Sequence, residues 1–263
     1  NSYDKYIEDL NLLKIQTVGA SHESYNFNNS QFALAVDAAS PVSSYRLDLI
    51  EKIPKTYEEV IVLAENKKVM WPIKPVDSIS SFNTIAANIG NPINNKHGEF
   101  IDKSLGIEIL KMMKALAVLV PTQCLTMNPI EVLDYMSTND DIVYCPLLYG
   151  YSNYSRKNFR NSIVHFSNIP SFNKDKNNNS GSQLGGTGIA ISKNSKEIDI
   201  ALEYSFWITS SECQKNLYYF SGGQPGNITA WKDKNVNKDS NNFFLDTSET
   251  LEKAWLRPRY DGY

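Results

Sequence analysis

The fold of this chain is decided by residues 184–226, which read LGGTGIAISKNSKEIDIALEYSFWITSSECQKNLYYFSGGQPG. The three glycines at the start predict a turn, and residues 189–192 are a short apolar run typical of a buried strand. Residues 209–212 predict the start of a second helix, because a hydroxyl residue serves as N-cap and Glu212 lies in the first turn. Between them, apolar and small residues recur at helical spacing and predict a helix with one buried face. That face comprises Ile198, Ala201, Leu202, Ser205 and Ile208.

Segments upstream continue this alternation of strands and helices. Residues 31–37 and 42–46 form one apolar strand pattern, and residues 144–153 form another that ends in aromatic residues. Thr56 and Glu59 have the spacing of a capping box. The patterns predict helices at 56–66, 77–89 and 101–119 and a strand at 68–72. Alternating strands and helices indicate an α/β class in which helices cover each sheet.

The order of these segments resembles that of the extracellular family 1 solute-binding proteins of ABC importers, over nearly all of the 263 residues. The resemblance implies an α/β, two-lobed periplasmic-binding-protein-like fold of type II, in which each lobe is a sheet flanked by helices. It implies hinge crossings near 37–42 and 146–150 and a third near the C-terminal helices. The implied division is lobe one from residues 1–39 and 146–210, lobe two from residues 40–145, and joining helices in residues 211–263.

One departure from the family concerns the start of the chain. Family members open with a βαβ unit that founds the first lobe, whereas residues 1–36 resemble only the middle of that lobe. The chain begins at Asn1 without an initiator Met, a basic-plus-apolar signal segment or a lipobox cysteine. We therefore expect a fragment of a longer mature protein in which lobe one is incomplete. A shortened but complete family member is the alternative.

The composition limits the classes of partner and site. A formal charge of −3 gives no electrostatic support to a nucleic-acid partner. No apolar run approaches the roughly 20 residues that span a bilayer. Cys124, Cys145 and Cys213 are widely spaced without a CxxC pair, which favours buried free thiols over a disulfide pair and argues against a metal site. No motif points to a cofactor. Residues 173–183 are polar and contain glycine, which predicts a surface loop.

Two acidic residues are candidates for binding a solute. Asp37 ends an apolar strand, where a buried carboxylate needs partners, so it either accepts ligand hydroxyls or ties hinge amides together. Asp77 precedes a predicted helix, where it is either an N-terminal cap or, as the resemblance implies, a polar residue that faces the cleft. His22 and Glu23 lie in a Ser- and Asn-rich loop without a second histidine four residues on, so structural or solvated roles are favoured.

Aromatic residues provide a second set of candidates. Sugars present apolar C–H faces on which an aromatic ring packs, while polar groups bind the hydroxyls. Tyr149 matches the place at which the family stacks an aromatic residue on its ligand. Trp71, at the end of a predicted strand, belongs either to the cleft wall or to the core. By resemblance, the remaining cleft residues are Asn153 in the segment after Tyr149, Gly185 and Gly186 in a hinge-side loop, and Gln224 at a cleft edge.

These features predict a substrate-binding component of an ABC importer, without enzyme activity, that captures a carbohydrate or similar polyhydroxylated solute by closure of two lobes. The resemblance implies ABC permease subunits as partners and an extracytoplasmic location, either periplasmic or as a cell-surface lipoprotein. No Arg or Lys falls among the candidates, which disfavours phosphorylated or acidic solutes. Amino-acid, peptide and polyamine ligands stay open, because Asp37 and Asp77 serve a cation equally well. The alternatives are a carbohydrate-active hydrolase with paired carboxylates, and a binding-protein fold recruited as a receptor or adhesin.

Overall fold

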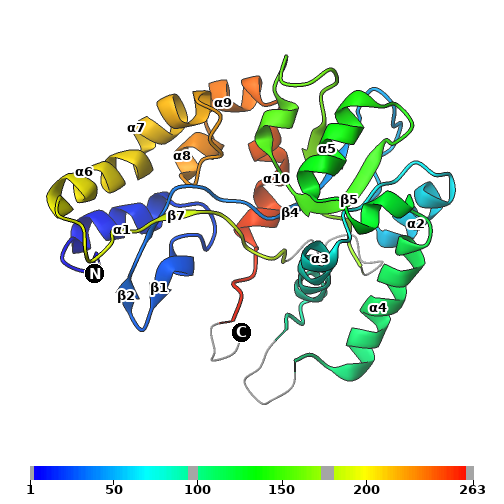
Figure 1. Ribbon diagram of the computed structural model, residues 1–263, viewed down its shortest axis with the longest axis horizontal. Coiled ribbons are helices and arrows are strands. Elements are labelled where there is room, and N and C mark those ends of the chain that lie inside the picture. Colours follow the sequence, from blue (N-terminus) through cyan, green and yellow to red (C-terminus); the bar gives the residue numbers. More distant parts are fainter. Residues whose placement is uncertain (1–2, 94–99, 173–180, 259–263) are drawn as a thin grey trace.

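The protein folds into two lobes, which lie at the left and right of the computed structural model in Figure 1. The structure describes residues 3–93, 100–172 and 181–258. Lobe one, at the left, contains α1 (Ile7–Gln16), η1 (Glu23–Tyr25), β1 (Asn26–Phe27), β2 (Ser30–Gln31), β3 (Leu34–Ala35), β7 (Gly188–Ile189) and α6 (Ile198–Thr209). Lobe two, at the right, contains β4 (Pro41–Tyr45), α2 (Tyr57–Glu65), α3 (Pro75–Asn88), α4 (Lys103–Ala117), η2 (Thr122–Leu125), α5 (Pro129–Thr138), β5 (Tyr144–Tyr149), η3 (Ser152–Ser155) and β6 (His165–Ser167). From α6 the chain returns to lobe two through α7 (Ser211–Cys213), η4 (Gln214–Tyr218), α8 (Ile228–Trp231), α9 (Lys234–Asp239) and α10 (Phe243–Glu252).

Lobe two is built on a three-stranded sheet in the order β5–β4–β6, with both pairs antiparallel. In the β4–β5 pair, Val42 lies opposite Leu148 and Tyr45 opposite Tyr144. Every residue of β4 is buried. Helices α3 and α5 contact β5, while α10 contacts β6. The sheet is therefore the centre of lobe two.

The second crossing between the lobes lies later in the chain than the sequence analysis placed it. Because β5 and β6 both pair with β4, residues 144–167 stay in lobe two, and the expected crossing at 146–150 is corrected. The chain returns to lobe one through residues 183–189, which run beside the outgoing segment 34–39 (Figure 1). Aromatic residues at the end of β5 suggested a strand that leaves the lobe, but the chain continues from β5 through η3 to β6 within lobe two.

The crossing segments are joined by backbone hydrogen bonds. Strands β3 and β7 pair antiparallel, and the amide of Gly185 donates to the carbonyl of Ala39 at 2.8 Å. A third segment joins them from the C-terminal side, where the amide of Gly226 donates to the carbonyl of Val36 at 3.0 Å. The first crossing and the C-terminal one are thus confirmed.

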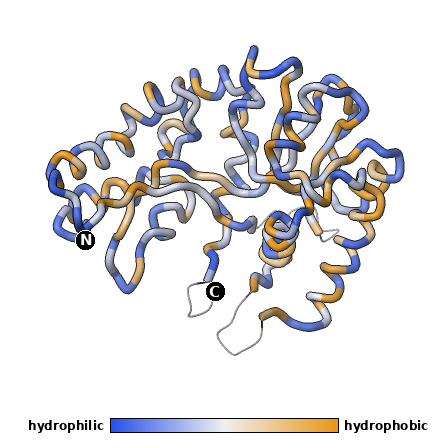
Figure 2. The backbone as a smooth tube through the Cα atoms, viewed as in Figure 1, coloured by the Kyte–Doolittle hydropathy of each residue, from blue (hydrophilic) through white to orange (hydrophobic). Residues whose placement is uncertain are grey.

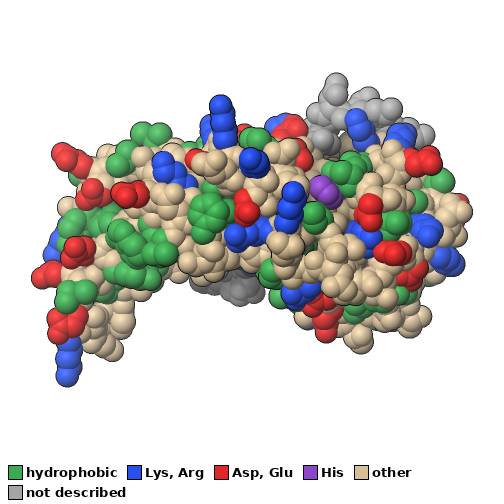
Figure 3. All heavy atoms as spheres, turned by 90° about the horizontal axis from the view of Figure 1, so that it is seen from above, with side chains coloured by type: hydrophobic (Ala, Val, Ile, Leu, Met, Phe, Trp, Pro, Cys, Tyr) green, Lys and Arg blue, Asp and Glu red, His purple; other side chains and the backbone are tan. Residues whose placement is uncertain are grey.

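The two lobes have separate cores of unequal size. The core of lobe two is continuous with the C-terminal helices and includes Met70, Ile85, Leu116, Tyr144, Phe166 and Phe244. Among the described residues, the buried core of lobe one consists of Tyr3, Leu10, Leu13 and Leu34. Large hydrophobic side chains are exposed on α6 of lobe one and on the nearby η4. They are Ile200, Tyr204, Trp207 and Leu217. Figure 3 shows hydrophobic groups on the surface of lobe one. Lobe one therefore buries less of its apolar surface than lobe two.

The predicted helices of lobe two are confirmed as α2, α3 and α4, and local sequence signals explain their starts. Thr56 caps α2 by accepting from the amide of Glu59, while the side chain of Glu59 accepts from the amide of Lys55. The predicted strand at 68–72 is reduced to one bridge between Val69 and Tyr144. Figure 2 shows hydrophobic and hydrophilic residues alternating along the outer helices, as amphipathic packing requires.

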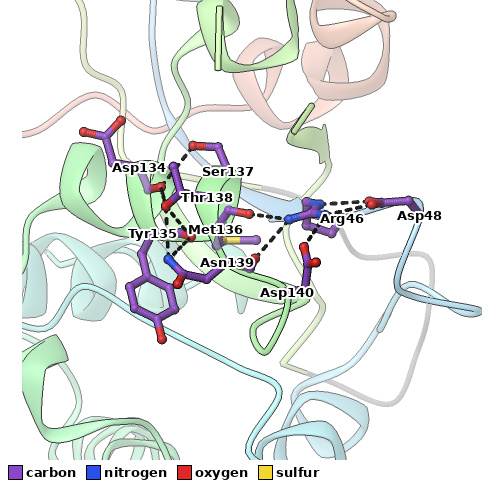
Figure 4. Close-up of polar contacts among 9 residues, drawn as sticks. All are labelled: Arg46, Asp48, Asp134, Tyr135, Met136, Ser137, Thr138, Asn139 and Asp140. Carbon is purple, nitrogen blue, oxygen red and sulfur yellow. Dashed lines mark hydrogen bonds and ion pairs between the residues drawn. The ribbon is translucent and has the colours of Figure 1, made fainter. Parts of the chain in front are cut away.

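Arg46 fastens the end of β4 to the C-terminus of α5 (Figure 4). Its side chain is 2% exposed, and its Nη1 donates to the carbonyls of Met136 at 2.7 Å and Asn139 at 3.0 Å. Its Nη2 forms ion pairs with Asp48 at 2.7 Å and Asp140 at 2.8 Å. A cation is favourable at a helix C-terminus, where carbonyls lack partners. This network fixes the position of β4.

Other expectations from the sequence have mixed outcomes. All three cysteines are buried and free, as predicted. Within the described ranges, every helix falls short of the length and apolarity that a membrane span needs. Residues 173–180 of the predicted surface loop lie outside the described residues, whereas Ser182 and Gln183 are buried, so the loop was drawn too long. In α6 the most buried residues are Ser205 and Thr209, and Ile198 is 37% exposed.

Candidate functional site

A pocket of about 310 Å³ lies on lobe two beside α3, and we call it the α3 pocket. Helix α3 contributes Asp77, Ser80 and Asn83 to its wall, and β5 contributes Tyr149. Its apolar lining comes from Val76, Ile79, Ile93 and Phe100. Polar groups together with an apolar wall are the composition that carbohydrate sites use.

Gln183 organises the polar wall of the α3 pocket. Its side-chain Nε2 donates to the hydroxyl of Tyr149 at 2.9 Å and to that of Ser80 at 3.3 Å. Its Oε1 accepts from Nδ2 of Asn83 at 2.9 Å, and its backbone N–H donates to the hydroxyl of Thr84 at 3.2 Å. Gln183 is buried. These bonds hold the Asn83 and Tyr149 side chains in place without a ligand.

Two residues that line the α3 pocket each have one buried acceptor atom without a hydrogen-bond partner in the described part of the chain: Oδ2 of Asp77 and Oδ1 of Asn83. Burial raises the pKa of Asp77; Lys74 opposes this effect and Glu131 adds to it. An unpaired buried acceptor costs about 1 to 3 kcal/mol. A solute that donates hydrogen bonds to both atoms would remove this cost.

Asp37 lies on the crossing segment, next to a group of tyrosines. Burial raises the pKa of its carboxyl to about 7. The pKa values of Tyr25, Tyr151 and Tyr218 are raised first by burial and then by the negative charge of Asp37. The negative charge of Asp77 also raises the pKa of Tyr151, so both carboxylates influence this tyrosine. The backbone of Asp37 is held at Thr187 and Pro225, so its position is fixed by the hinge.

Three tyrosine rings of this region lie directly against glycines. A Cβ added to Gly185 would come within 2.6 Å of the Tyr149 ring, one on Gly188 within 2.6 Å of the Tyr25 ring, and one on Gly223 within 2.5 Å of the Tyr218 ring. A real Cβ essentially never lies this close to another heavy atom, so a larger residue at any of the three positions would force the tyrosine ring to shift. Gly186 has a φ of +124° and a Cβ there would lie 2.5 Å from the carbonyl oxygen of Asp37. The glycine run predicted as a hinge-side loop therefore shapes the tyrosine positions.

The structure places three candidates from the sequence in structural roles. Trp71 is 1% exposed in the lobe-two core, and its Nε1 donates to Ser81, so it is corrected to a core residue. The side chain of Gln224 accepts from the amide of Ser152 and donates to the carbonyls of Ala38 and Gly150, which ties three segments of the hinge together. Its hydrogen-bonding groups are therefore already in use.

Asn153 is likewise a structural residue. Its Nδ2 donates to the carbonyl of Gly222 at 3.0 Å, and its Oδ1 accepts from Arg156 at 3.4 Å. These bonds tie η3 to the loop after η4. Of the remaining candidates, Asp77 and Tyr149 line the α3 pocket, Gly185 and Gly186 line a second pocket, and Asp37 lies on the crossing segment.

Sequence reasoning missed several residues of the site. Asn83 and Gln183 carry no motif, and Gln183 was assigned to the surface loop. Tyr25 and Tyr218 lie far apart in sequence and meet Asp37 only in the folded chain. Arg257 lines both the α3 pocket and a second pocket of about 280 Å³ that includes Gly185 and Gly186. The candidates from the sequence included no Arg or Lys, so Arg257 is a lining residue that they missed.

His22 is the residue before η1 in lobe one. Its side chain is buried, and burial lowers its pKa while Glu23 opposes this effect. In the part of the chain that the structure describes, no group of three or more His, Cys, Asp or Glu side chains is arranged to hold a metal ion.

No family model and no curated protein sequence matches this chain. The maltose-bound MalE3 of T. maritima matches its structure with a TM-score of 0.79 over 96% of this chain and 69% of that one, at 17% identity. An ABC transporter solute-binding protein from Agrobacterium radiobacter, in complex with ribitol, gives a TM-score of 0.77 over 95% of this chain and 66% of that one, at 17% identity. An ABC substrate-binding protein from Listeria monocytogenes, in complex with cycloalternan, gives 0.74 over 99% of this chain and 70% of that one, at 15% identity.

This similarity concerns the fold. Nearly all of this chain is matched, and it spans about two thirds of the length of each of these neighbours. The neighbours are described as binding proteins. The chain therefore has the two-lobed α/β fold of ABC transporter solute-binding proteins, as the order of its sequence segments predicted.

Proposed function

We propose that this chain is the substrate-binding component of an ABC importer and captures a carbohydrate or similar polyhydroxylated solute between its lobes. The observation that carries the proposal is the pair of buried, unpaired acceptors in the α3 pocket, Asp77 Oδ2 and Asn83 Oδ1. Hydroxyl groups are donors that satisfy such acceptors. Neighbours with the same fold are described in complex with maltose, ribitol and cycloalternan, which supports this class of solute.

In this proposal the solute binds first to the α3 pocket, because the Gln183 network holds that wall in place. The ring of Tyr149 packs against a C–H face of the solute. Asp37 and the backbone of Gly185 and Gly186 bind from the crossing segments when the lobes close. Closure requires hinge segments that absorb a change in backbone angles, and residues 36–41 and 183–188 are in the position to do so.

The proposal gives the chain ABC permease subunits as partners and an extracytoplasmic location, either periplasmic or as a cell-surface lipoprotein. Binding energy must favour the closed state if a permease is to distinguish loaded from empty protein. Asp37 and Asp77 then bind the solute and do not catalyse its cleavage.

A thermal-shift panel tests this function, with maltose, maltotetraose, ribitol and glycerophosphocholine as probes. Calorimetry then measures the affinity for each probe that raises the melting temperature, and chromatography checks whether the probe is cleaved. A saturable shift without cleavage supports solute binding. Cleavage would show a hydrolase that uses the two carboxylates. An unchanged melting temperature with every probe would contradict a maltose- or ribitol-type solute. It would favour a receptor or adhesin whose partner is a protein.

A further inference from the structure

The carboxylate of Asp37 has no partner, although tyrosines from both lobes lie around it. In the described part of the chain it forms neither a hydrogen bond nor an ion pair. Tyr25 belongs to η1 of lobe one, Tyr151 precedes η3 of lobe two, and Tyr218 ends η4. The charge of Asp37 reaches all three phenol groups and raises their pKa values. We call these four residues the Asp37 group.

Backbone pairing places two of the rings beside the crossing segment. The Tyr25 ring lies against Gly188 of β7, the strand that pairs with β3 just before Asp37. The Tyr218 ring lies against Gly223, in the segment that then forms a bridge with Asp37. The strand pairing of the hinge therefore assembles the Asp37 group.

The Asp37 group is accessible to solvent and negatively charged. Asp37, Tyr25 and Tyr218 are half-buried, and Tyr151 is 40% exposed. Asp77 adds a second negative charge that acts on Tyr151. Among the described residues, no Lys or Arg opposes the effect of these charges on Tyr151 or Tyr218. A solute that reaches this place therefore meets a negative charge that the protein leaves uncompensated.

Two cations lie in the region, but neither neutralises Asp37. Lys74 lowers the pKa of Asp77, and Arg257 lowers that of Tyr25. Burial raises the pKa of Asp37 to about 7 without an opposing cation. A positive charge at the Asp37 group has to come from the solute.

We propose that the Asp37 group binds a protonated amine of the solute, so that the chain takes a hydroxylated compound that carries an amine, such as an amino sugar or an aminated polyol. This inference rests on the proposed function, because it concerns a solute held between the lobes. An ammonium group has three N–H donors. Within the described ranges, the phenol oxygens of Tyr151 and Tyr218 have no hydrogen-bond partner, so these oxygens and the carboxylate supply three acceptors.

The chemistry of the Asp37 group favours an amine over a hydroxyl at this position. A hydroxyl donates one hydrogen bond but leaves the negative charge of Asp37 in place. A hydrogen bond between ionised groups is roughly twice as strong as one between neutral groups. The tyrosine rings attract a cation as well, because their faces carry negative partial charge. A cation that contacts both lobes also favours the closed state.

The test compares sorbitol with glucamine, in which an amine replaces one terminal hydroxyl of sorbitol. N-acetylglucamine is the uncharged control with a group at the same position. Calorimetry at about pH 8 should show that glucamine binds roughly tenfold to a hundredfold more tightly than either neutral compound. Asp37→Asn should remove this difference, whereas Tyr218→Phe should reduce it roughly threefold to tenfold, because one acceptor is lost and the ring is kept.

The pH dependence provides a second readout. With a pKa of about 7, Asp37 is mostly protonated at about pH 5 and mostly ionised at about pH 8, while the amine stays protonated. The glucamine affinity should therefore rise roughly tenfold or more over this interval. The phenols of Tyr25, Tyr151 and Tyr218 titrate at higher pH, since their pKa values are raised. Asp77 also titrates below this range, so D37N is the variant that assigns the rise to Asp37.

D246N is the matched control, because burial raises the pKa of Asp246 too but this residue is outside the Asp37 group. It should keep both the preference for glucamine and its pH dependence. Equal affinity of wild type for sorbitol and glucamine, or an unchanged preference in D37N, would overturn the inference even if maltose or ribitol binds. Tight binding of cadaverine, an amine without hydroxyls, with no binding of any hydroxylated probe would instead overturn the proposed function and retain the amine site. Failure of every amine to bind would overturn the inference.

Discussion

Asp37→Asn should make the protein more stable above neutral pH and leave it unchanged in acid. Burial raises the pKa of Asp37 from 3.8 to about 7. The folded state therefore binds a proton that the unfolded state releases, and the stability from this proton is fully present below the unfolded pKa and lost as pH rises through the folded one. The shift in pKa from 3.8 to about 7 corresponds to a loss of about 4 kcal/mol of unfolding free energy between acid and alkaline pH. This value is an upper bound, because solvent reaches part of the residue.

The assay is urea unfolding of wild type and D37N at about pH 5 and about pH 8. Over that interval the wild-type chain should lose roughly 2 to 3 kcal/mol of unfolding free energy that D37N keeps. Other groups titrate in the same range, but they do so in both proteins and cancel in the difference. A difference between the two proteins that is the same at both pH values would refute the argument, because Asp37 would then be ionised throughout, as a solvated carboxylate is.

Three further predictions follow from single contacts. Tyr149→Ala should weaken solute binding by roughly 1 to 3 kcal/mol through the loss of ring contact, whereas Tyr149→Phe should lose only the hydrogen bond to Gln183. If calorimetry shows unchanged affinity for Tyr149→Ala while its melting temperature falls sharply, the ring belongs to the core. Gly185→Ala should displace that ring, because the new Cβ would lie 2.6 Å from it. It should reduce affinity more than Gly90→Ala, which strains the backbone at a φ of +85° but contacts no atom within 4 Å; equal losses of affinity in calorimetry would contradict this. Arg46→Met should lower the unfolding free energy by about 3 kcal/mol, because two carbonyls at the end of α5 lose a charged donor; a urea midpoint unchanged from wild type would show that water replaces it.

The sequence predicted those parts of the fold that depend on local signals. Thr56 and Glu59 marked the start of α2, and the spacing of apolar residues located α3, α4 and α6 within a few residues. These signals act between residues close in sequence, through capping bonds and a single buried face. The resemblance of the segment order to family 1 solute-binding proteins then implied the two-lobed fold, which the similar structures confirm.

The path between the lobes was not available from local signals. The end of β5 and the glycine run at 185–188 both had the features of a hinge crossing, and only the pairing of β5 with β4 shows which one crosses. Strand pairing joins residues about a hundred positions apart, and their register depends on the whole lobe. Trp71 had the same ambiguity, since a tryptophan at a strand end suits a core as well as a cleft wall.

By itself, the sequence determined the α/β class and the helices of lobe two, and it proposed Asp37, Asp77 and Tyr149 as candidates. Only the tertiary structure decided that Gln183 holds Tyr149 and Asn83, that Gln224 is used in the hinge, and that Arg257 lines the pocket. The physical reason is that a polar side chain can bind a solute only if its hydrogen-bonding groups are not already used within the fold. Whether a partner is present depends on segments distant in the chain, which no local pattern records.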